Sequence, residues 1–315
     1  MAYYTKINKL EFKKYLKDYS FGDLYYFKGI NEGIENTNYF FKTKYNKCVL
    51  TIYENKITER IKEKNLSFFI DLVNFLRKKK FPCPKILCNN NNKQLNFHKK
   101  KQYTIIDFVE GKIAKKINFQ HCYKLGRTLA TLHKKTLNFE KKKKNNFSLN
   151  EWDKLIKRKI KLSKNESFFL KEEIKYIKEN WPKKLPTGII HGDLFPDNVF
   201  FKNNNIVGII DLSNACNDFF CYDLSICINS WCYEKKLNID KMRNLIKGYN
   251  SIRKIKIQEI KYLNLFLRAS SLRFYLSRLM DSQNKKIPKK YKKNPKEYLK
   301  KLKYFQVNDV NNYFL

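Results

Sequence analysis

The hydrophobic pattern of the chain changes its period near residue 109, and this change constrains the fold more than any other feature. Before that point, aromatic and β-branched residues favour short strands, at about 24–28, 39–44, 48–54, 85–88 and 103–108. Helical spacing is expected at about 8–19, 60–79, 119–137, 151–162, 167–180, 222–232, 240–251 and 257–280, with one later β segment at 188–211. Strands followed by helices indicate an α+β fold.

The length of 315 residues allows one large domain or two lobes. We expect an N-terminal lobe of residues 1–108, a hinge at 109–111 and a mainly helical C-terminal lobe of 112–315. Gly111 relieves local backbone restraint, which suits a hinge. Residues 141–146 are polar and low in complexity, so we expect a linker there.

The net charge of +38 raises the question of a nucleic-acid or membrane partner. Lysines are spread through almost every segment, and the basic runs 141–144 and 289–293 lack the interleaved aromatic residues or arginines of an RNA-binding platform. The chain is also rich in Asn, Ile, Phe and Tyr, which share AT-rich codons with Lys. We therefore attribute the charge to nucleotide composition, and expect only weak, salt-sensitive attraction to polyanions and no specific nucleic-acid partner.

The sequence favours a cytoplasmic protein. It contains no run of about 20 apolar residues, and its N-terminus lacks the pattern of a secretory signal, so we expect no membrane partner. The eight cysteines form no Cys-x-x-Cys pair and have no histidine at metal-ligand spacing. Free, reduced thiols are favoured over disulfides or a zinc site.

Two apolar runs of the β segment each end in a carboxylate, Asp193 and Asp211. Asn198 follows Asp193 by five residues, and a hairpin through 203–205 can return Asp211 to the same place. Phosphoryl transfer needs one group to orient the attacking hydroxyl, and oxygen ligands to hold magnesium on the phosphates. Each of these residues alone is common in turns, but the combination of apolar strands and three oxygen donors indicates a kinase-type site.

This pattern resembles the catalytic and metal loops of the aminoglycoside phosphotransferase and choline kinase superfamily, relatives of protein kinases. The resemblance implies a bilobal protein-kinase-like fold, with a small antiparallel-sheet N-terminal lobe that binds the nucleotide. It further implies ATP and Mg²⁺ as cofactors, Asp193 as the catalytic base, and Asn198 and Asp211 as magnesium ligands. His191 is then expected to brace the loop, because the hydroxyl needs only one proton acceptor.

Further motifs are similar to those of the type II homoserine kinases, the kinase-like rather than the GHMP-type branch. They lie between about residues 20 and 281, in the segments 29–41, 49–54, 108–111, 211–218, 222–232 and 267–279. The resemblance implies transfer of the ATP γ-phosphoryl group to the hydroxyl of L-homoserine, in threonine biosynthesis. One alternative is a kinase of the same fold that acts on choline, ethanolamine or an aminoglycoside. A second, from another class, is an inactive polyanion-binding relative.

The resemblance also suggests nucleotide-binding residues in the first lobe. Backbone N–H groups of the expected loop 29–38 could cover phosphates, although by itself the loop is more typical of an ordinary hairpin, because two glycines four apart are a weaker signal than a full glycine-rich loop. Where kinase relatives carry a phosphate-binding lysine, on the strand 48–54, this chain has Thr51. The candidate nucleotide-binding residues are Gly29, Gly33, Asn36, Asn38 and Thr51.

A different lysine could replace the missing strand lysine, and the candidates are Lys42, Lys47 and Lys56. Glu59 or Glu63 is the candidate carboxylate that would orient this lysine.

Acceptor-binding residues are expected on the C-terminal side of the metal loop. A substrate carboxylate favours a guanidinium partner, and Arg268, Arg273 and Arg278 lie five residues apart on one expected helix. That spacing turns successive side chains by about 140°, so at most one or two face a pocket; Arg273 is the first candidate, and a structural salt bridge is the alternative.

Two carboxylates near the metal loop have open roles. Asp218 either meets the substrate ammonium or braces its own loop. Asp223 precedes an apolar helix and is expected to be its N-cap, a role worth about 1 kcal/mol.

Overall fold

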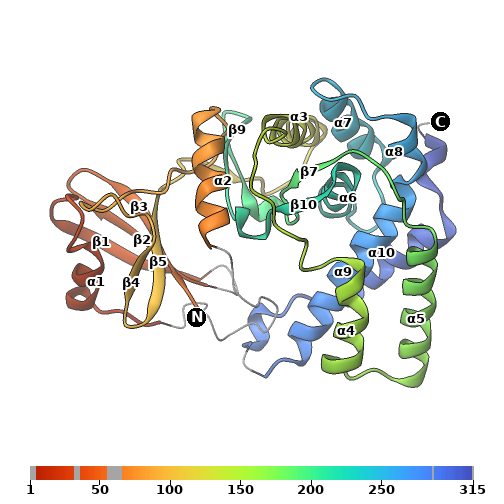
Figure 1. Cartoon of the computed structure of the whole chain (residues 1–315), viewed down its shortest axis with the longest axis horizontal. Coiled ribbons are helices and arrows are strands. Elements are labelled where there is room, and N and C mark those ends of the chain that lie inside the picture. Colours follow the sequence, from red (N-terminus) through yellow and green to blue (C-terminus); the bar gives the residue numbers. More distant parts are fainter. Residues whose placement is uncertain (1–4, 32–35, 55–65, 286, 314–315) are drawn as a thin grey trace. The chain divides into compact units, whose positions relative to one another are not determined.

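The computed structural model describes residues 5–31, 36–54, 66–285 and 287–313. It divides into two compact units, Met1–Glu110 and Gly111–Leu315 (Figure 1). The antiparallel sheet of the first unit and the helices of the second confirm the expected α+β class. In the described part of the chain, every helix is too short or too polar to cross a membrane.

The first unit is built on a five-stranded antiparallel sheet with the order β1-β2-β3-β5-β4. The strands are β1 (Leu24–Ile30), β2 (Asn36–Thr43), β3 (Lys47–Tyr53), β4 (Asn96–His98) and β5 (Lys101–Asp107), with helices α1 (Lys9–Leu16) and α2 (Leu66–Lys78). Alternate residues of β2 are buried, as the two-residue period of a strand requires. Phe12 and Tyr15 of α1 pack with the buried face of the sheet, including Phe41 and Leu50.

The second unit is mainly helical. Its helices are α3 (Phe119–Lys135), α4 (Leu149–Lys159), α5 (Lys164–Glu179), α6 (Phe220–Trp231), α7 (Ile239–Asn250), α8 (Ile257–Lys261), α9 (Leu263–Gln283) and α10 (Lys296–Val307). Its strands are β6 (Lys112–Ile113), β7 (Thr187–Ile190), β8 (Val199–Lys202), β9 (Asn205–Ile209) and β10 (Cys216–Phe219). Eleven of the twelve residues of α6 are buried, so this helix forms the centre of the unit.

The strands of the second unit form two small antiparallel sheets, β6-β8-β9 and β10-β7. Asn203 and Asn204 join β8 to β9 with φ angles of 49° and 58°. Asparagine adopts this left-handed conformation more readily than most residues, and two such residues match the twist of a tight hairpin. The hairpin thereby returns the chain from Asn198 to Asp211.

Several local expectations were wrong. Residues 85–88 form only an isolated bridge, between Ile86 and Ile106, and the short strand β4 was not foreseen. The expected helix 257–280 is interrupted at Tyr262, and α10 was missed. Residues 141–146 are not a free linker, because Lys144 bridges to Asn217 of β10. All eight cysteines are free, and seven of them are buried, as expected for thiols that act as small apolar side chains.

A close crossing of α3 and α7 leads to a stability prediction for Gly248→Ala. A Cβ atom at Gly248 would lie 2.0 Å from the backbone oxygen of Tyr123, and backbone cannot move aside as a flexible side chain can. Helix propensity alone would make alanine stabilising by about 1 kcal/mol. We expect destabilisation by about 1–3 kcal/mol instead, measured by urea unfolding, because overpacking dominates. Lys247→Ala, at an exposed position of the same helix, is the matched control; equal stability of the two variants would contradict the prediction.

Candidate active site

The expected catalytic residues lie on two neighbouring loops of the second unit. Asp193 follows β7, and Asn198 is the last residue of a short 3-10 turn. The side-chain amide nitrogen of Asn198 donates to the Asp193 backbone oxygen at 2.8 Å. The backbone nitrogen of Ile210 donates to the backbone oxygen of Asn198 at 3.0 Å. The next residue is Asp211, so the structure brings the backbones at Asn198 and Asp211 side by side.

The oxygen donors of these loops suit a hard divalent cation. Asn198 uses its amide nitrogen within the loop, so its side-chain oxygen is the atom that can coordinate a cation. Asp211 accepts a hydrogen bond from Ser213 Oγ at 2.5 Å on one carboxylate oxygen. Its backbone is left-handed, with φ 59° and ψ 51°, a conformation that costs an aspartate less than most residues. Among the described residues, no three His, Cys, Asp or Glu side chains form a metal cluster; the expected ligands, Asn198 and Asp211, are one amide and one carboxylate.

His191 braces both loops, as expected. Its side chain is buried, its Nδ1 accepts from the backbone nitrogen of Asp193 at 3.2 Å, and its Nε2 lies 3.1 Å from the Ile210 oxygen. We assign the proton to Nε2, since this nitrogen faces an acceptor. His191 therefore ties the position of Asp193 to the strand that leads to Asp211.

The expectation that Asp223 is an N-cap was wrong. Phe219 occupies the cap of α6, and Asp223 lies in the first turn of the helix with its side chain fully buried. Its carboxylate accepts from the backbone nitrogens of His191 at 2.8 Å and Gly192 at 2.9 Å. Burial acts to raise the pKa of Asp223, but hydrogen bonds and nearby histidines outweigh it and lower the pKa. Asp223 thus anchors the peptide groups that precede Asp193.

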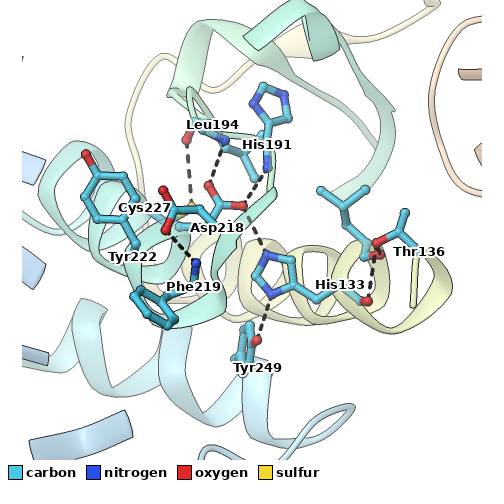
Figure 2. A network of polar contacts seen from close by, with 12 residues as sticks. His133, Thr136, His191, Leu194, Asp218, Phe219, Tyr222, Cys227 and Tyr249 are labelled. Atoms are coloured by element: carbon cyan, nitrogen blue, oxygen red, sulfur yellow. Dashed lines mark hydrogen bonds and ion pairs between the residues drawn. The ribbon is translucent and has the colours of Figure 1, made fainter. Parts of the chain in front are cut away.

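A buried histidine that the sequence analysis missed completes this anchor. His133 of α3 places Nε2 3.1 Å from Asp223 Oδ2 and Nδ1 2.7 Å from the Tyr249 hydroxyl (Figure 2). A neutral ring with its proton on Nε2 donates to Asp223 and accepts from Tyr249, which satisfies all three groups. His133 lies four residues after Leu129, on the apolar face of the expected helix, so this spacing was a signal in the sequence for its burial.

The buried histidine predicts how stability depends on pH. Burial lowers the pKa of His133 below its usual 6.5. The unfolded chain then binds a proton that the folded chain does not, so stability falls as the pH falls below about 6.5. We expect His133→Gln, whose amide can donate to Asp223 but does not titrate, to reduce the fall in Tm between about pH 7 and pH 5. An unchanged Tm profile would show that His133 is not the group responsible.

Arg273 and Asp218 lie next to the loops that carry Asp193 and Asp211. Arg273 is only 6% exposed; its Nη1 donates to the Gly192 oxygen at 2.7 Å, and its guanidinium lies 4.5 Å from the Phe147 ring centre. Asp218 accepts from Asn145 Nδ2 at 2.6 Å and from the Phe219 nitrogen at 2.7 Å, and burial raises its pKa. Asp218 therefore braces its loop; contact with the substrate ammonium, the other role expected of it, stays a prediction.

The three arginines of α9 point to different partners, as their spacing predicted. Arg268 forms a bidentate ion pair with Glu173, at 2.9 and 2.7 Å, and Arg278 pairs with Glu297 at 2.5 Å. Arg273 forms no ion pair with any side chain in the described ranges. A buried guanidinium without a carboxylate partner is costly unless a ligand supplies the opposite charge.

In the first unit, the expected loop 29–38 is shorter than predicted. Gly29 belongs to β1, and Asn36 and Asn38 belong to β2. Thr51 of β3 lies opposite Asn38, and its hydroxyl donates to the Asn38 side-chain oxygen at 2.8 Å. Gly33 lies outside the described residues.

The structure also places two of the candidate replacement cations. The Lys42 ammonium lies 5.9 Å from the Phe40 ring centre, and Lys47 pairs with Glu110 at 2.7 Å on the surface. Lys42 shares a strand face with Asn38, since even-numbered residues of β2 point the same way. Lys56, Glu59 and Glu63 lie outside the described residues.

Comparison with known proteins identifies the family. Residues 27–253 match the model of the phosphotransferase enzyme family, which covers most of both units. The chain belongs to this family. Among the relatives of this phosphotransferase, proteins named homoserine kinase from Rhizobium meliloti and Bartonella henselae are each 40% identical over 287 residues. The matches cover 89% of this chain, and 87% and 89% of those proteins, so the expected resemblance to homoserine kinases is confirmed.

A solved structure supports the fold of this phosphotransferase. The amicoumacin kinase hAmiN, in complex with AMP-PNP, Ca²⁺ and Ami, is similar with a TM-score of 0.74 at 13% identity. The similarity covers 98% of this chain and 94% of that one. The expected aminoglycoside-phosphotransferase type of kinase-like fold is thereby confirmed.

Proposed function

We propose that this phosphotransferase is a homoserine kinase, which transfers the γ-phosphoryl group of ATP to the hydroxyl of L-homoserine and forms O-phospho-L-homoserine in threonine biosynthesis. The observation that carries the proposal is the 40% identity to proteins named homoserine kinase, which extends over 89% of the chain. We place the reaction in the cytoplasm, because the sequence favours a cytoplasmic protein.

In this proposal, Asp193 is the catalytic base. Its carboxylate orients the homoserine hydroxyl and accepts the hydroxyl proton as the oxygen attacks the γ-phosphorus. The bond from that phosphorus to the β–γ bridging oxygen breaks, and ADP leaves. Asn198 and Asp211 hold Mg²⁺, which neutralises charge on the phosphates when bound. Asp223, His191 and His133 keep the loop of Asp193 in place through the hydrogen bonds described above.

Residues of the first unit bind the nucleotide in this proposal. Gly29 of β1 and Asn36 of β2, together with Gly33, cover the phosphates with their backbone N–H groups. Asn38 and Thr51 add polar side chains that are already joined by a hydrogen bond. Lys42 is the preferred replacement for the missing strand lysine, because it lies on the same strand face as Asn38, whereas Lys47 is paired with Glu110.

The acceptor is recognised through opposite charges in the second unit. Arg273 binds the substrate carboxylate, and Asp218 binds the substrate ammonium. A buried guanidinium that forms no ion pair with the described side chains favours an acceptor that carries a carboxylate over choline, whose quaternary ammonium instead favours an aromatic cage.

The test is an acceptor panel with the purified chain and Mg-ATP. L-Homoserine, choline, ethanolamine and kanamycin are supplied separately, and products are identified by ³¹P NMR and mass spectrometry. We expect O-phospho-L-homoserine as the main product. Phosphorylation of another acceptor with homoserine left unchanged would assign the chain to that substrate, and no turnover with any acceptor would favour the inactive relative.

A further inference from the structure

Residues 143–147, here called the strap, begin beside β10, at the edge that does not pair with β7. Lys144 forms a parallel bridge with Asn217, the Asn217 nitrogen donates to the Lys143 oxygen at 2.8 Å, and the Lys143 nitrogen donates to Asn217 Oδ1 at 2.8 Å. These bonds involve the backbone, so they hold this segment irrespective of its side chains. The strap therefore presents its side chains at defined positions beside the metal loop.

Lys143 brings a positive charge to that loop. Its Nζ donates to the Ser213 backbone oxygen at 2.7 Å, and Ser213 Oγ donates to Asp211 at 2.5 Å. The oxygen of the next residue, Asn214, would lie 3.2 Å from a Cβ atom at Gly192. The ammonium of Lys143 is thus close to the loop of the proposed magnesium ligand and to the residue before the proposed base.

The rest of the strap contacts the two acceptor-binding residues proposed above. Asn145 donates to the Asp218 carboxylate at 2.6 Å, and the Phe147 ring lies against the guanidinium of Arg273. One short segment thereby touches Asp218 and Arg273 and adds a second cation. Lys143 and Arg273 supply two cations, and Asp218 supplies one carboxylate. Together they complement the head group of an α-amino acid, which carries one carboxylate and one ammonium.

We propose that Lys143 binds the α-carboxylate of the acceptor amino acid and so determines specificity for amino-acid over amino-alcohol acceptors. The proposal deepens the homoserine kinase function and rests on it. An ammonium has three N–H donors, so Lys143 can bind a carboxylate oxygen in addition to partners of its own chain such as the Ser213 backbone oxygen. Its partial burial strengthens that attraction relative to open solvent.

The experiment compares Lys143→Met with the unaltered chain. We expect the KM for L-homoserine to rise about 10- to 100-fold, the loss expected for a hydrogen bond to a charged group. We expect kcat and the KM for ATP to stay within about twofold. The second ligand is 3-aminopropan-1-ol, which is homoserine without its carboxylate, measured as a substrate or as a competitor of homoserine. Its KM or Ki should be the same for both proteins.

Lys142→Met is the matched control, because it removes the same charge from an exposed neighbouring position in the same basic run. Its KM for homoserine should stay within about twofold of the original. An equal effect of the two variants would show that only general charge matters and would overturn the proposal. A fall in kcat with both ligands would assign Lys143 to the phosphoryl group or the metal loop instead. If the unaltered chain does not phosphorylate homoserine, the proposed function fails first.

Discussion

Replacement of Asp193 by asparagine lowers kcat about 10²- to 10⁴-fold, the usual contribution of a general base. The amide has nearly the same size and still hydrogen-bonds, but it cannot accept the hydroxyl proton, so the loss falls on the chemical step. The KM for ATP should change little. The measurement is steady-state production of ADP with homoserine, together with the circular dichroism spectrum and Tm.

Asp197→Asn is the control for this prediction. Asp197 lies four residues further along the same loop, 58% of its side chain is exposed, and its ion pair with Lys293 is 3.3 Å long. Exposed pairs of this kind contribute about 0–1 kcal/mol, so activity and Tm should be close to those of the original chain. Similar kcat values for the two variants would exclude Asp193 as the base.

Replacement of Asp223 by alanine destabilises the fold by about 3–5 kcal/mol, as expected when one partner of a buried charged network is removed. The backbone nitrogens of His191 and Gly192 and the Nε2 of His133 would lose their acceptor in a fully buried place. The free energy of unfolding, measured in urea, tests the prediction. The kcat should fall as well, because these bonds hold the loop that carries Asp193.

A surface aspartate gives the matched comparison for Asp223. Asp240 begins the helix α7 and forms only a 3.6 Å pair with Arg243, with both side chains more than half exposed. Asp240→Ala should change the free energy of unfolding by no more than about 0.5–1 kcal/mol. If Asp223→Ala proved as mild, the hydrogen bonds to the catalytic loop would contribute little to stability.

The proposed catalytic residues could be selected from the sequence because they lie close together along the chain. Asp193, Asn198 and Asp211 fall within nineteen positions, between apolar runs whose strands and hairpin follow from local patterns. The α+β class was predictable for the same reason, because it depends on where along the chain the strand period of two residues gives way to the helix period of 3.6 residues. Asn8, Ser163 and Asn238 cap helices through local hydrogen bonds. The starts of α1 and α7 were predicted to within one residue, whereas α5 begins at Lys164 and was expected from 167.

Contacts between distant segments account for the errors. Asp223 fits a helix N-cap by its local sequence, but its partners are residues 191, 192 and 133, between 31 and 90 positions away. The run 141–146 has the composition of a linker, yet the edge of β10 offers it backbone hydrogen bonds. In both cases, the contacting residues are distant in the sequence and cannot be identified from the local sequence around Asp223 or from the composition of the run 141–146.

Periodicity and short motifs are local properties, so the class of fold, the loops that carry Asp193, Asn198 and Asp211, and the similarity to homoserine kinases were predictable from the residues alone. The contacts between distant segments show that Asp223 and His133 anchor the loop of Asp193 and that Lys143 lies beside the loop of Asp211. They also show that, within the described residues, Arg273 differs from Arg268 and Arg278 in having no ion pair. Burial and pairing depend on which distant segments meet, and hydrogen bonds to backbone groups leave no mark on residue spacing.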